Sequence, residues 1–501
     1  MNPSRYVLAY DVGTSGVKGV LVSTEGEILL AETEAYPLYT PQPGWAEQVP
    51  EDYWNAVCKV TRTLMAKSGV APAAIAGMTF GSMWKGIIPI DRQGRVLCSS
   101  ILWLDARAGD QAKRLNERFG AGRFSAADYW PKLMWLRENH PEVIENAEMI
   151  LEVNSFLKWK ATGKAAMDIS NCFVRSFDPK LETFYEEFLS FIDIPQEKFP
   201  PYVHSYDRVG CVTEAAAEEL GLAPGIPVFG GSNDIQAVTV GSGCADIGGV
   251  HIYFGSSGWI GYTRPHITTT GGSPFDEGRS LTLFGLRAIG LTFNWMAQTL
   301  YKAEVESLGS QAYALIDREA EQIPAGSDGV LVTPWFHGEW PPLCSLNARG
   351  NFLNLSPRHD RRHMARATME GVCYHLRMWA EYAEEKGGCV WPEAVNAIGG
   401  GAGSEVWMQM LADILDTPVN VPYAPRHAGA MGVACCVLVG LGQYADYSEA
   451  AKNLKMERCF RPRPEAVAAY QKSYAVFKQL YTLLKPMFVQ MNTVKTEGAN
   501  K

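Results

Sequence analysis

In some segments of the chain apolar and polar residues follow a strand pattern, and in others the apolar residues recur at helical spacing. Together these patterns predict an ordered series of strands and helices. Residues 6–11 and 17–23 are dense in β-branched and aromatic side chains, and GTSG at 13–16 separates them. This pattern is typical of strand, tight turn, strand. Residues 28–34 add a third strand after a Glu-Gly turn, and 51–68 carry apolar residues at helical spacing. The start of the chain therefore predicts a three-stranded antiparallel unit followed by an amphipathic helix.

The same plan returns half a chain later. Residues 250–262 (VHIYFGSSGWIGY) place GSSG between two apolar strands, and a third strand is expected at 280–286. One such turn alone fits an ordinary hairpin as well as a phosphate loop. Two copies, each followed by alternating helices and strands, favour a duplicated fold with a nucleotide between its halves. We predict an α/β fold of two actin-like (ribonuclease H-like) domains, 1–245 and 246–490, with a catalytic cleft between them.

Two strand-to-helix turns carry candidate chemistry. A short apolar strand at 227–231 ends in Ser-Asn-Asp, and a helix is expected at 235–241. Asp234 is then well placed as a general base, although a helix N-cap is the competing interpretation. The second turn, GGGAGS at 399–404, lies between a strand and a helix from Glu405 to about Asp416. Such a glycine-rich turn allows adenine or ribose to lie against the backbone.

Length and composition place the chain in a broad class. A chain of 501 residues is too long for a single hydrophobic core, which suggests two domains. The net charge of −9 argues against a broad nucleic-acid or anionic-membrane surface, but it leaves room for ATP at a local cationic or Mg²⁺ site. No secretion signal or apolar run long enough to span a membrane is evident, and the eleven cysteines show no metal-ligand spacing. We expect a cytoplasmic protein with buried, reduced cysteines.

The first glycine turn has the groups needed to hold phosphate. The hydroxyls of Thr14 and Ser15 and the loop N–H groups can donate to phosphate oxygens, and Lys18 adds a positive charge nearby. Asp11 stands where a carboxylate can hold Mg²⁺, directly or through water.

Polar and aromatic residues farther along predict an acceptor site. Asp105 and Arg107 at a strand end suit polyol recognition, since one accepts hydrogen bonds from hydroxyls and the other donates them. The alternative is a helix N-cap at Asp105 with a solvated Arg107. Trp45, in the proline-rich loop 37–50, can line the same site, although loop packing is the slightly favoured explanation.

These motifs together resemble the FGGY carbohydrate kinases, and within them most closely the xylulokinases, over nearly the whole chain. The resemblance implies that Asp234 is the catalytic base, and that the turns at 13–16 and 255–258 are phosphate motifs that include Gly255, Ser256 and Ser257. It also implies that the adenosine moiety contacts Gly400, Gly401, Ala402 and Ser404. The segments that carry it are DVGTSGVK (11–18), GWAEQVPEDYW (44–54), WLDAR (103–107), GGSND (230–234), FGSSG (254–258) and IGGGAGSEVWMQMLADI (398–414).

The acceptor motifs depart from the family more than the ATP motifs do. Xylulokinases usually have Met-His-Gly where this chain has Met83-Trp84-Lys85 before a glycine. The Asn of their WNDxR is Leu104, and the GERxP loop reads GEWPP at 338–342, without its Arg. Met83, Trp84 and Lys85 are still expected to line the sugar site. Lys85 suggests an acidic sugar such as an aldonate.

The resulting hypothesis is an ATP-dependent kinase for a pentulose or a related sugar, polyol or aldonate, with ATP and Mg²⁺ as its ligands. A homodimer is possible, because homodimers are common in the family. Two rivals remain: another actin-like ATPase, such as a chaperone-type or filament protein, and a non-catalytic sugar or nucleotide sensor. The segments GWAEQ (44–48) and WLDAR (103–107), which we call the sugar-loop motifs, count against the first rival. The presence of Asp11 and Asp234 counts against the second. An acetate-type kinase fits the adenosine motif poorly.

Overall fold

The computed structural model describes residues 5–171, 174, 179–265, 273–276, 278–339 and 343–492. The chain forms two compact units that are each discontinuous in sequence. The first unit contains residues 1–241, 264–281 and 427–454, and the second contains 242–263, 282–426 and 455–501. Each unit is built around a mixed β-sheet with helices packed on it, which is the actin-like α/β architecture predicted above.

The sheet of the first unit contains both the antiparallel hairpin and the parallel strands that the sequence predicts. β1 is antiparallel to β2 and parallel to β5, and β2 is antiparallel to β3. The strands across the sheet are β11 (Arg208–Cys211), β12 (Pro227–Phe229), β5 (Ile75–Ser82), β1 (Tyr6–Gly13), β2 (Gly16–Ser23) and β3 (Ile28–Ala35), with β13 (Ser232–Asn233) on β5.

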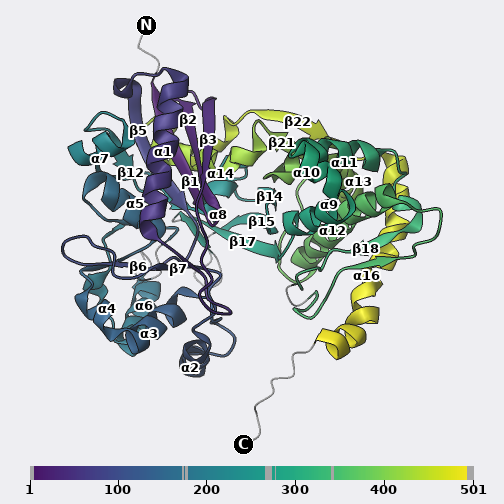
Figure 1. The fold of residues 1–501 in the computed structure, drawn as a ribbon, viewed down its shortest axis with the longest axis horizontal. Coiled ribbons are helices and arrows are strands. Elements are labelled where there is room, and N and C mark those ends of the chain that lie inside the picture. Colours follow the sequence, from purple (N-terminus) through teal and green to yellow (C-terminus); the bar gives the residue numbers. More distant parts are fainter. Residues whose placement is uncertain are drawn as a thin grey trace, which may run out of the picture. The chain divides into compact units, whose positions relative to one another are not determined.

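Helices cover both faces of this sheet. α1 lies across β2 and β3 on one face, where Figure 1 shows it in front of the strands. On the opposite side α14 packs against β1 and β5 and also against α8. Glycines on β5 make room for α14, because a Cβ on Gly81 would lie 2.3 Å from Val433. The helices are α1 (Pro50–Ser68), α5 (Val153–Thr162), α7 (Glu214–Leu220), α8 (Asp234–Gly241), α14 (Ala428–Gly440) and α15 (Tyr447–Lys452).

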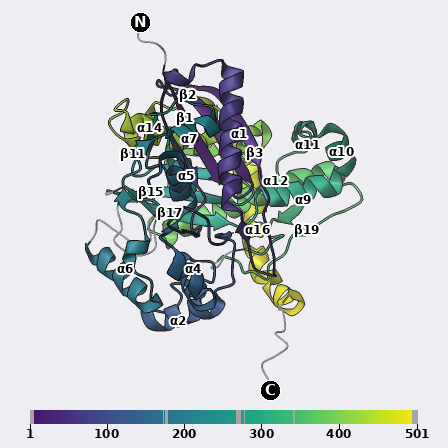
Figure 2. The same cartoon turned by 60° about the vertical axis from the view of Figure 1, so that its left-hand side comes forward.

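A helical insertion between β5 and β11 has a core of its own. Leu133, Ile144 and Phe188 are among the buried residues of this core. Figure 2 shows its helices gathered below the strands of the unit. The insertion contains α2 (Gly109–Phe119), α3 (Tyr129–Asn139), α4 (Pro141–Asn146) and α6 (Pro179–Ile192), and the paired short strands β6 (Ile88–Ile90) with β8 (Met149–Leu151) and β9 (Met167–Asp168) with β10 (Tyr202–Val203); β7 (Ser100–Ile101) pairs with β4 (Glu47–Gln48).

The sheet of the second unit repeats the plan of the first, which confirms the predicted duplication. β14 is antiparallel to β15 and parallel to β20, as β1 is to β2 and β5. The strands in order are β17 (Arg279–Leu286), β15 (Gly258–Pro265), β14 (Val250–Phe254), β20 (Val395–Ile398), β21 (Val419–Pro422) and β22 (Met456–Phe460), and β16 (Ser273–Asp276) pairs with the start of β17.

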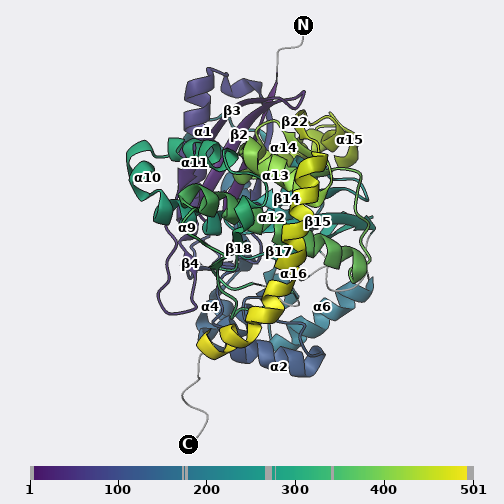
Figure 3. The same cartoon turned by 90° about the vertical axis from the view of Figure 1, so that its right-hand side faces the viewer.

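Long helices make up most of the core of the second unit. Trp335, Tyr374 and Trp407 are buried among α12, α13 and α16. In Figure 3 the yellow α16 runs beside α12 and α13, and this helix was not among the elements predicted from the sequence. The helices are α9 (Gly290–Leu300), α10 (Lys302–Leu308), α11 (Gln311–Glu321), α12 (Arg361–Glu385), α13 (Glu405–Leu415) and α16 (Pro464–Asn492), and β18 (Leu331–Thr333) pairs with β19 (Asn351–Leu353). No helix in the described ranges combines the length and the apolar character that crossing a bilayer requires.

Candidate active site

Three parallel strands of the first unit bring the two candidate carboxylates to one edge of the sheet. Asp11, near the end of β1, is in register with Gly81 of β5, and Ser232 of β13 is in register with the same glycine. Asp234 follows β13 directly. Because the carboxyl ends of parallel strands meet at the same edge, the residues that follow them converge there. The two carboxylates were separately predicted, and the sheet brings them together.

The electrostatics of Asp234 reflect this convergence. Burial raises the pKa of its carboxyl from 3.8 to about 7, and repulsion from Asp11 adds to the rise, while the N–H of Ile235 and the charge of Lys18 oppose it. The Nζ of Lys18 lies 3.6 Å from Oδ2 of Asp11, across the β1–β2 ladder. A carboxylate whose pKa is near neutrality is suited to accept a proton in a reaction near pH 7.

Asp234 is the first residue of α8, but another side chain caps the helix. Oδ1 of Asn233 accepts a hydrogen bond from the N–H of Gln236 at 2.7 Å, as an N-cap side chain does. The carboxylate of Asp234 accepts instead from the adjacent N–H of Ile235 at 3.0 Å. The N-cap interpretation therefore applies to Asn233 and leaves the carboxylate of Asp234 available for chemistry.

A buried polar chain fixes Asn233 and so fixes the start of α8. The backbone N–H of Asn233 donates to Oγ of Ser170 at 2.7 Å, and its side-chain amide donates to the Ser170 carbonyl. Ser170 in turn donates to the carboxylate of Asp168, which also accepts from Asn154 and Asn171. The folded chain buries Asp168 completely.

Glycines allow α8 and α14 to approach until their backbones touch. A Cβ on Gly432 would lie 1.7 Å from the carbonyl oxygen of Ala237, and one on Gly241 would lie 1.7 Å from that of Ala428. The first turn of α14 reaches Asp11, because a Cβ on Gly429 would lie 2.7 Å from its Oδ2. The helix crossing therefore sets the positions of Asp234 and of the backbone beside Asp11.

The first glycine turn is the tight hairpin that was predicted. Gly13 pairs with Gly16, so Thr14 and Ser15 form its tip, and Ser15 is exposed. Two residues from the sugar-loop motifs hold Thr14: Gln48 donates to its carbonyl at 2.8 Å, and the indole of Trp103 donates to its hydroxyl at 3.0 Å. Trp103 was not predicted, although its place in WLDAR was a signal for it.

Asp105 and Arg107 form a buried ion pair. The guanidinium of Arg107 donates to both carboxylate oxygens of Asp105, at 2.9 and 2.7 Å, and also to Glu47 at 2.6 Å. It lies 3.6 Å above the ring of Trp45, and its side chain is 3% exposed. Neither residue matches the alternative of a helix cap and a solvated arginine, because α2 begins only at Gly109 with Ala108 as its N-cap. Contact with substrate stays a prediction for all three.

Met83, Trp84 and Lys85 follow the end of β5. Met83 is buried, and its sulfur lies 3.8 Å from the hydroxyl oxygen of Thr14. The ammonium of Lys85 forms an ion pair with Asp128 and lies 4.7 Å from the center of the Trp84 ring. Sequence reasoning did not find Asp128, which has no motif around it.

Lys132 is a second cation that sequence reasoning missed. Its ammonium is fully buried and donates to the carbonyls of Lys85 and Leu102, at 2.9 and 2.7 Å. Burial lowers the pKa of this group to about 7, and the positive charge of Lys85 acts in the same direction. The signal was a single lysine inside the apolar run YWPKLMWL.

In the second unit, residues 255–257 form a hairpin loop between β14 and β15. Phe254 pairs with Gly258, so the loop residues Gly255, Ser256 and Ser257 project beyond the ladder. The start of α9 supports the loop, because its first N–H groups donate to the carbonyls of Gly255 and Ser256, at 2.9 and 3.1 Å. A role in binding phosphate stays a prediction.

The glycine-rich turn of the second unit leads into α13. Ser404 is the N-cap, and its hydroxyl accepts from the N–H of Trp407 at 3.1 Å. Ala402 is fully buried, so only its backbone can meet a ligand, whereas Gly400 is exposed and has no atom near its Cβ position. With Gly401, these residues form the predicted glycine-rich turn, and contact with adenosine stays a prediction. The neighboring Asp317 hydrogen-bonds Ser404, and burial raises its pKa to about 6.

Part of the GEWPP loop can be placed. Glu339 is buried and accepts from the N–H of Arg287 at 3.0 and 3.3 Å. The Trp and two Pro residues at 340–342 lie outside the described residues.

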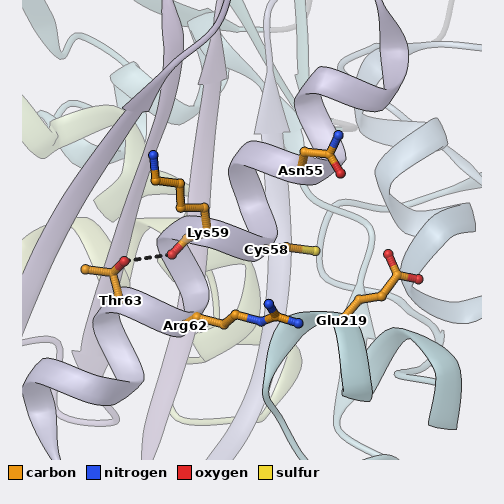
Figure 4. Close-up of a pocket in the computed structure, with 6 residues that line it drawn as sticks. All are labelled: Asn55, Cys58, Lys59, Arg62, Thr63 and Glu219. Carbon is orange, nitrogen blue, oxygen red and sulfur yellow. Dashed lines mark hydrogen bonds between the residues drawn. The ribbon is translucent and has the colours of Figure 1, made fainter.

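The hollow in Figure 4 is separate from the predicted site residues. It has a volume of about 360 Å³, and α1 and α7 line it with Asn55, Cys58, Lys59, Arg62, Thr63 and Glu219. Burial raises the pKa of the Cys58 thiol to about 12, so the thiol stays protonated at neutral pH.

Two family models cover most of the chain. The N-terminal domain of the FGGY family of carbohydrate kinases matches residues 6–241, and the C-terminal domain matches residues 267–441. The xylulose kinase of Bacillus subtilis is 28% identical over 498 residues, which cover 96% of this chain and 98% of that protein.

Solved structures show the same fold. A ligand-bound xylulose kinase from Lactobacillus acidophilus superposes with a TM-score of 0.82 at 25% identity, covering 97% of this chain and 99% of that one. A gluconate kinase from the same organism also has a TM-score of 0.82, at 24% identity, with the same coverage of 97% and 99%.

Proposed function

Because the chain belongs to the FGGY family of carbohydrate kinases, we propose that it transfers the γ-phosphoryl group of ATP to a hydroxyl of a five-carbon ketose or a related polyol. The observation that carries this proposal is the placement of Asp234 beside Asp11 at the same sheet edge as the Thr14-Ser15 turn. The names of the related xylulose kinases support a pentulose as the acceptor substrate. The similarity to a gluconate kinase makes an aldonate the second candidate.

In the proposed reaction Asp234 accepts the proton of the acceptor hydroxyl as its oxygen attacks the γ-phosphorus. The bond from that phosphorus to the bridging oxygen breaks, and ADP leaves. Thr14, Ser15 and Lys18 are proposed to hold phosphate oxygens. Phosphoryl transfer depends mainly on positioning and charge neutralisation, which these fixed groups supply.

In the second unit, we assign phosphate binding to the loop of Gly255, Ser256 and Ser257. We assign adenosine binding to Gly400, Gly401, Ala402 and Ser404. The support is their position in two loops that expose backbone groups at the ends of strands β14 and β20.

The residues around Asp11 fit a divalent cation that is shared with phosphate. Asp11 and Asp234 repel each other, which a cation would relieve, and the absence of a side chain at Gly429 leaves space at Oδ2 of Asp11. Among the described residues no group of three ligating side chains could hold a metal alone. Mg²⁺ commonly binds through one or two carboxylates plus substrate phosphates, and when bound it neutralises charge on them.

Gly429→Ala tests the role of Asp11. The new Cβ would lie 2.7 Å from Oδ2, so the carboxylate must turn away. We expect the Mg²⁺ concentration for half-maximal rate to rise about tenfold, the loss of roughly one ligand interaction, while thermal stability changes little because a flexible side chain can move. Gly109→Ala, where no atom lies near the Cβ position, is the matched control. An unchanged Mg²⁺ dependence would argue against Asp11 as the metal-binding carboxylate.

The proposed function itself is tested by ADP release from Mg·ATP with ketopentoses, polyols and aldonates. We expect strong stimulation by at least one acceptor, with phosphorylated product found by mass spectrometry. ATP binding without stimulation by any acceptor would favour the sensor. ATP hydrolysis at a rate that no acceptor changes would favour another type of actin-like ATPase.

Cytoplasmic location and a homodimer complete the proposal. All cysteines among the described residues are free, as expected in a reducing compartment. The homodimer rests on the family resemblance alone.

A further inference from the structure

The ion pair of Lys85 with Asp128 is partly exposed and firmly held. Only 23% of the Lys85 side chain and 24% of the Asp128 side chain are exposed. The second oxygen of Asp128 accepts from the N–H and the hydroxyl of Ser125, at 2.7 and 2.8 Å. Burial would raise the pKa of Asp128, but Lys85 and Ser125 outweigh it and hold the pKa below the ordinary value. Asp128 is therefore a charged partner for Lys85 at neutral pH.

The backbone of Lys85 is also fixed in an unusual conformation. Its φ angle of 66° lies in the left-handed region, which residues with a side chain rarely adopt. The buried ammonium of Lys132 donates to the carbonyl of Lys85 and holds this conformation. Strained backbone that its surroundings enforce is concentrated at ligand sites. The buried side chain of Lys132 therefore helps to fix the backbone from which the Lys85 side chain extends.

The pair lies close to the catalytic edge in the first unit. Lys85 comes three residues after Ser82, which is in register with both Val12 and Asn233, the neighbors of Asp11 and Asp234. Met83, which lies between Ser82 and Lys85 in the sequence, donates its N–H to the carbonyl of Val12 at 2.9 Å. A group placed there can meet an acceptor whose hydroxyl reaches Asp234.

Among the described residues, the charged groups named near the pair have partners of their own. Asp128 neutralises Lys85, while Asp105 and Glu47 surround the guanidinium of Arg107. Lys132 is fully buried and already donates to two carbonyls. Lys85, which was predicted to suit an acidic sugar, therefore presents no unpaired positive charge to it.

We propose that the Lys85–Asp128 pair determines acceptor specificity, selecting a neutral polyhydroxyl sugar and rejecting aldonates. The inference rests on the proposed kinase function. Lys85 offers donors and Asp128 offers an acceptor to neighboring hydroxyls, so a neutral polyol satisfies both. A carboxylate would have to displace Asp128 from Lys85 or lie beside its negative charge, and such repulsion is an effective means of discrimination.

The test compares acceptors that differ mainly in charge. Rates of ADP release are measured with D-xylulose, xylitol, D-xylonate and D-gluconate. For the unmodified protein we expect kcat/KM for the better neutral acceptor to exceed that for the better aldonate by at least about 100-fold, because like charges brought together are strongly disfavoured. An aldonate preferred by the unmodified protein would overturn the inference without any variant.

Two nearly isosteric substitutions then assign the effect to the pair. Asp128→Asn frees the charge of Lys85 and should lower the neutral-to-aldonate ratio at least about tenfold. Lys85→Met should reduce use of the neutral acceptor without improving use of the aldonates. Glu32→Gln, which breaks the surface pair with Lys67 at 2.6 Å, is the matched control and should leave the ratio unchanged.

The outcomes separate the inference from the function it rests on. Turnover with an unchanged ratio in Asp128→Asn overturns the specificity role and leaves the kinase function standing. Absence of turnover with every acceptor in the unmodified protein overturns both. Thermal melts of each variant identify misfolding, and the ratio within one preparation does not depend on the folded fraction.

Discussion

Replacing Asp234 by asparagine is expected to lower kcat by about 10² to 10⁴-fold, the usual contribution of a general base, and to stabilise the protein at pH 8. Asparagine keeps the shape of the side chain, but it cannot accept the proton of the attacking hydroxyl. ATP binding should be retained, because the residues assigned to the nucleotide are unchanged. Loss of rate with intact ATP binding would identify a chemical role.

The gain in stability follows from the direction of the pKa shift. The folded protein raises the pKa of Asp234 from 3.8 to about 7, so between these values the folded state binds more protons than the unfolded state. Stability therefore falls as pH rises through this window, and the cost is fully present above pH 7. Removing the charge should restore about 1 to 4 kcal/mol at pH 8, the larger figure corresponding to the whole shift.

Urea unfolding at pH 5 and pH 8, together with initial rates, measures both effects. The difference in stability between Asp234→Asn and the unmodified protein should grow with pH. In the unmodified protein kcat/KM should fall as pH drops below about 7, because Asp234, the proposed base, becomes protonated. Asp110→Asn, at an exposed position, is the control. Turnover retained by Asp234→Asn would exclude Asp234 as the base.

Gly432→Ala is expected to have the second largest effect, through the crossing of α8 and α14. A Cβ there would lie 1.7 Å from the carbonyl oxygen of Ala237, and neither helix backbone can yield as a side chain would. We expect a loss of about 2 to 4 kcal/mol in the free energy of unfolding, at or above the usual range for overpacking. Because α8 begins with Asp234, kcat should fall at least about tenfold in the molecules that remain folded.

Gly109→Ala again provides the comparison, since it adds the same methyl group where nothing lies within 4 Å. Denaturant unfolding gives the stability change, and active-site titration with tight-binding nucleotide separates lost rate from lost folded protein. A Gly432→Ala variant with normal kcat and stability would show that the crossing does not position the base.

Much of the fold was predictable because local sequence encodes it. The two hairpins at 13–16 and 255–258 depend on glycines and on alternating strands, and both formed as predicted. Helix α1 was also predicted within one residue of its observed ends, because its apolar residues recur at helical spacing. The discontinuity of the units was not foreseen. Residues 427–454 belong to the first unit because the small residues of α14 pack on β1 and β5.

The sequence by itself determined which groups are available. Asp11, Asp234, the two hydroxyl-bearing turns and the glycine-rich turn could be identified by their residue types and by their places at strand ends, and they indicate a carbohydrate kinase. Residues such as Asp128, Lys132 and Gly429 could not be found in this way. They come from distant segments of the chain, and the role of each depends on the atoms that it contacts in the folded structure.

Only the tertiary structure decided how those groups are charged and aimed. It raised the pKa of Asp234 by burying it near Asp11, and it enclosed Arg107 between Asp105 and Trp45. It also paired Lys85 with Asp128, and the proposal of a neutral acceptor rests on that pair. Burial and long-range ion pairs depend on which distant segments come into contact in the folded protein. Local patterns in the sequence do not identify those contacts.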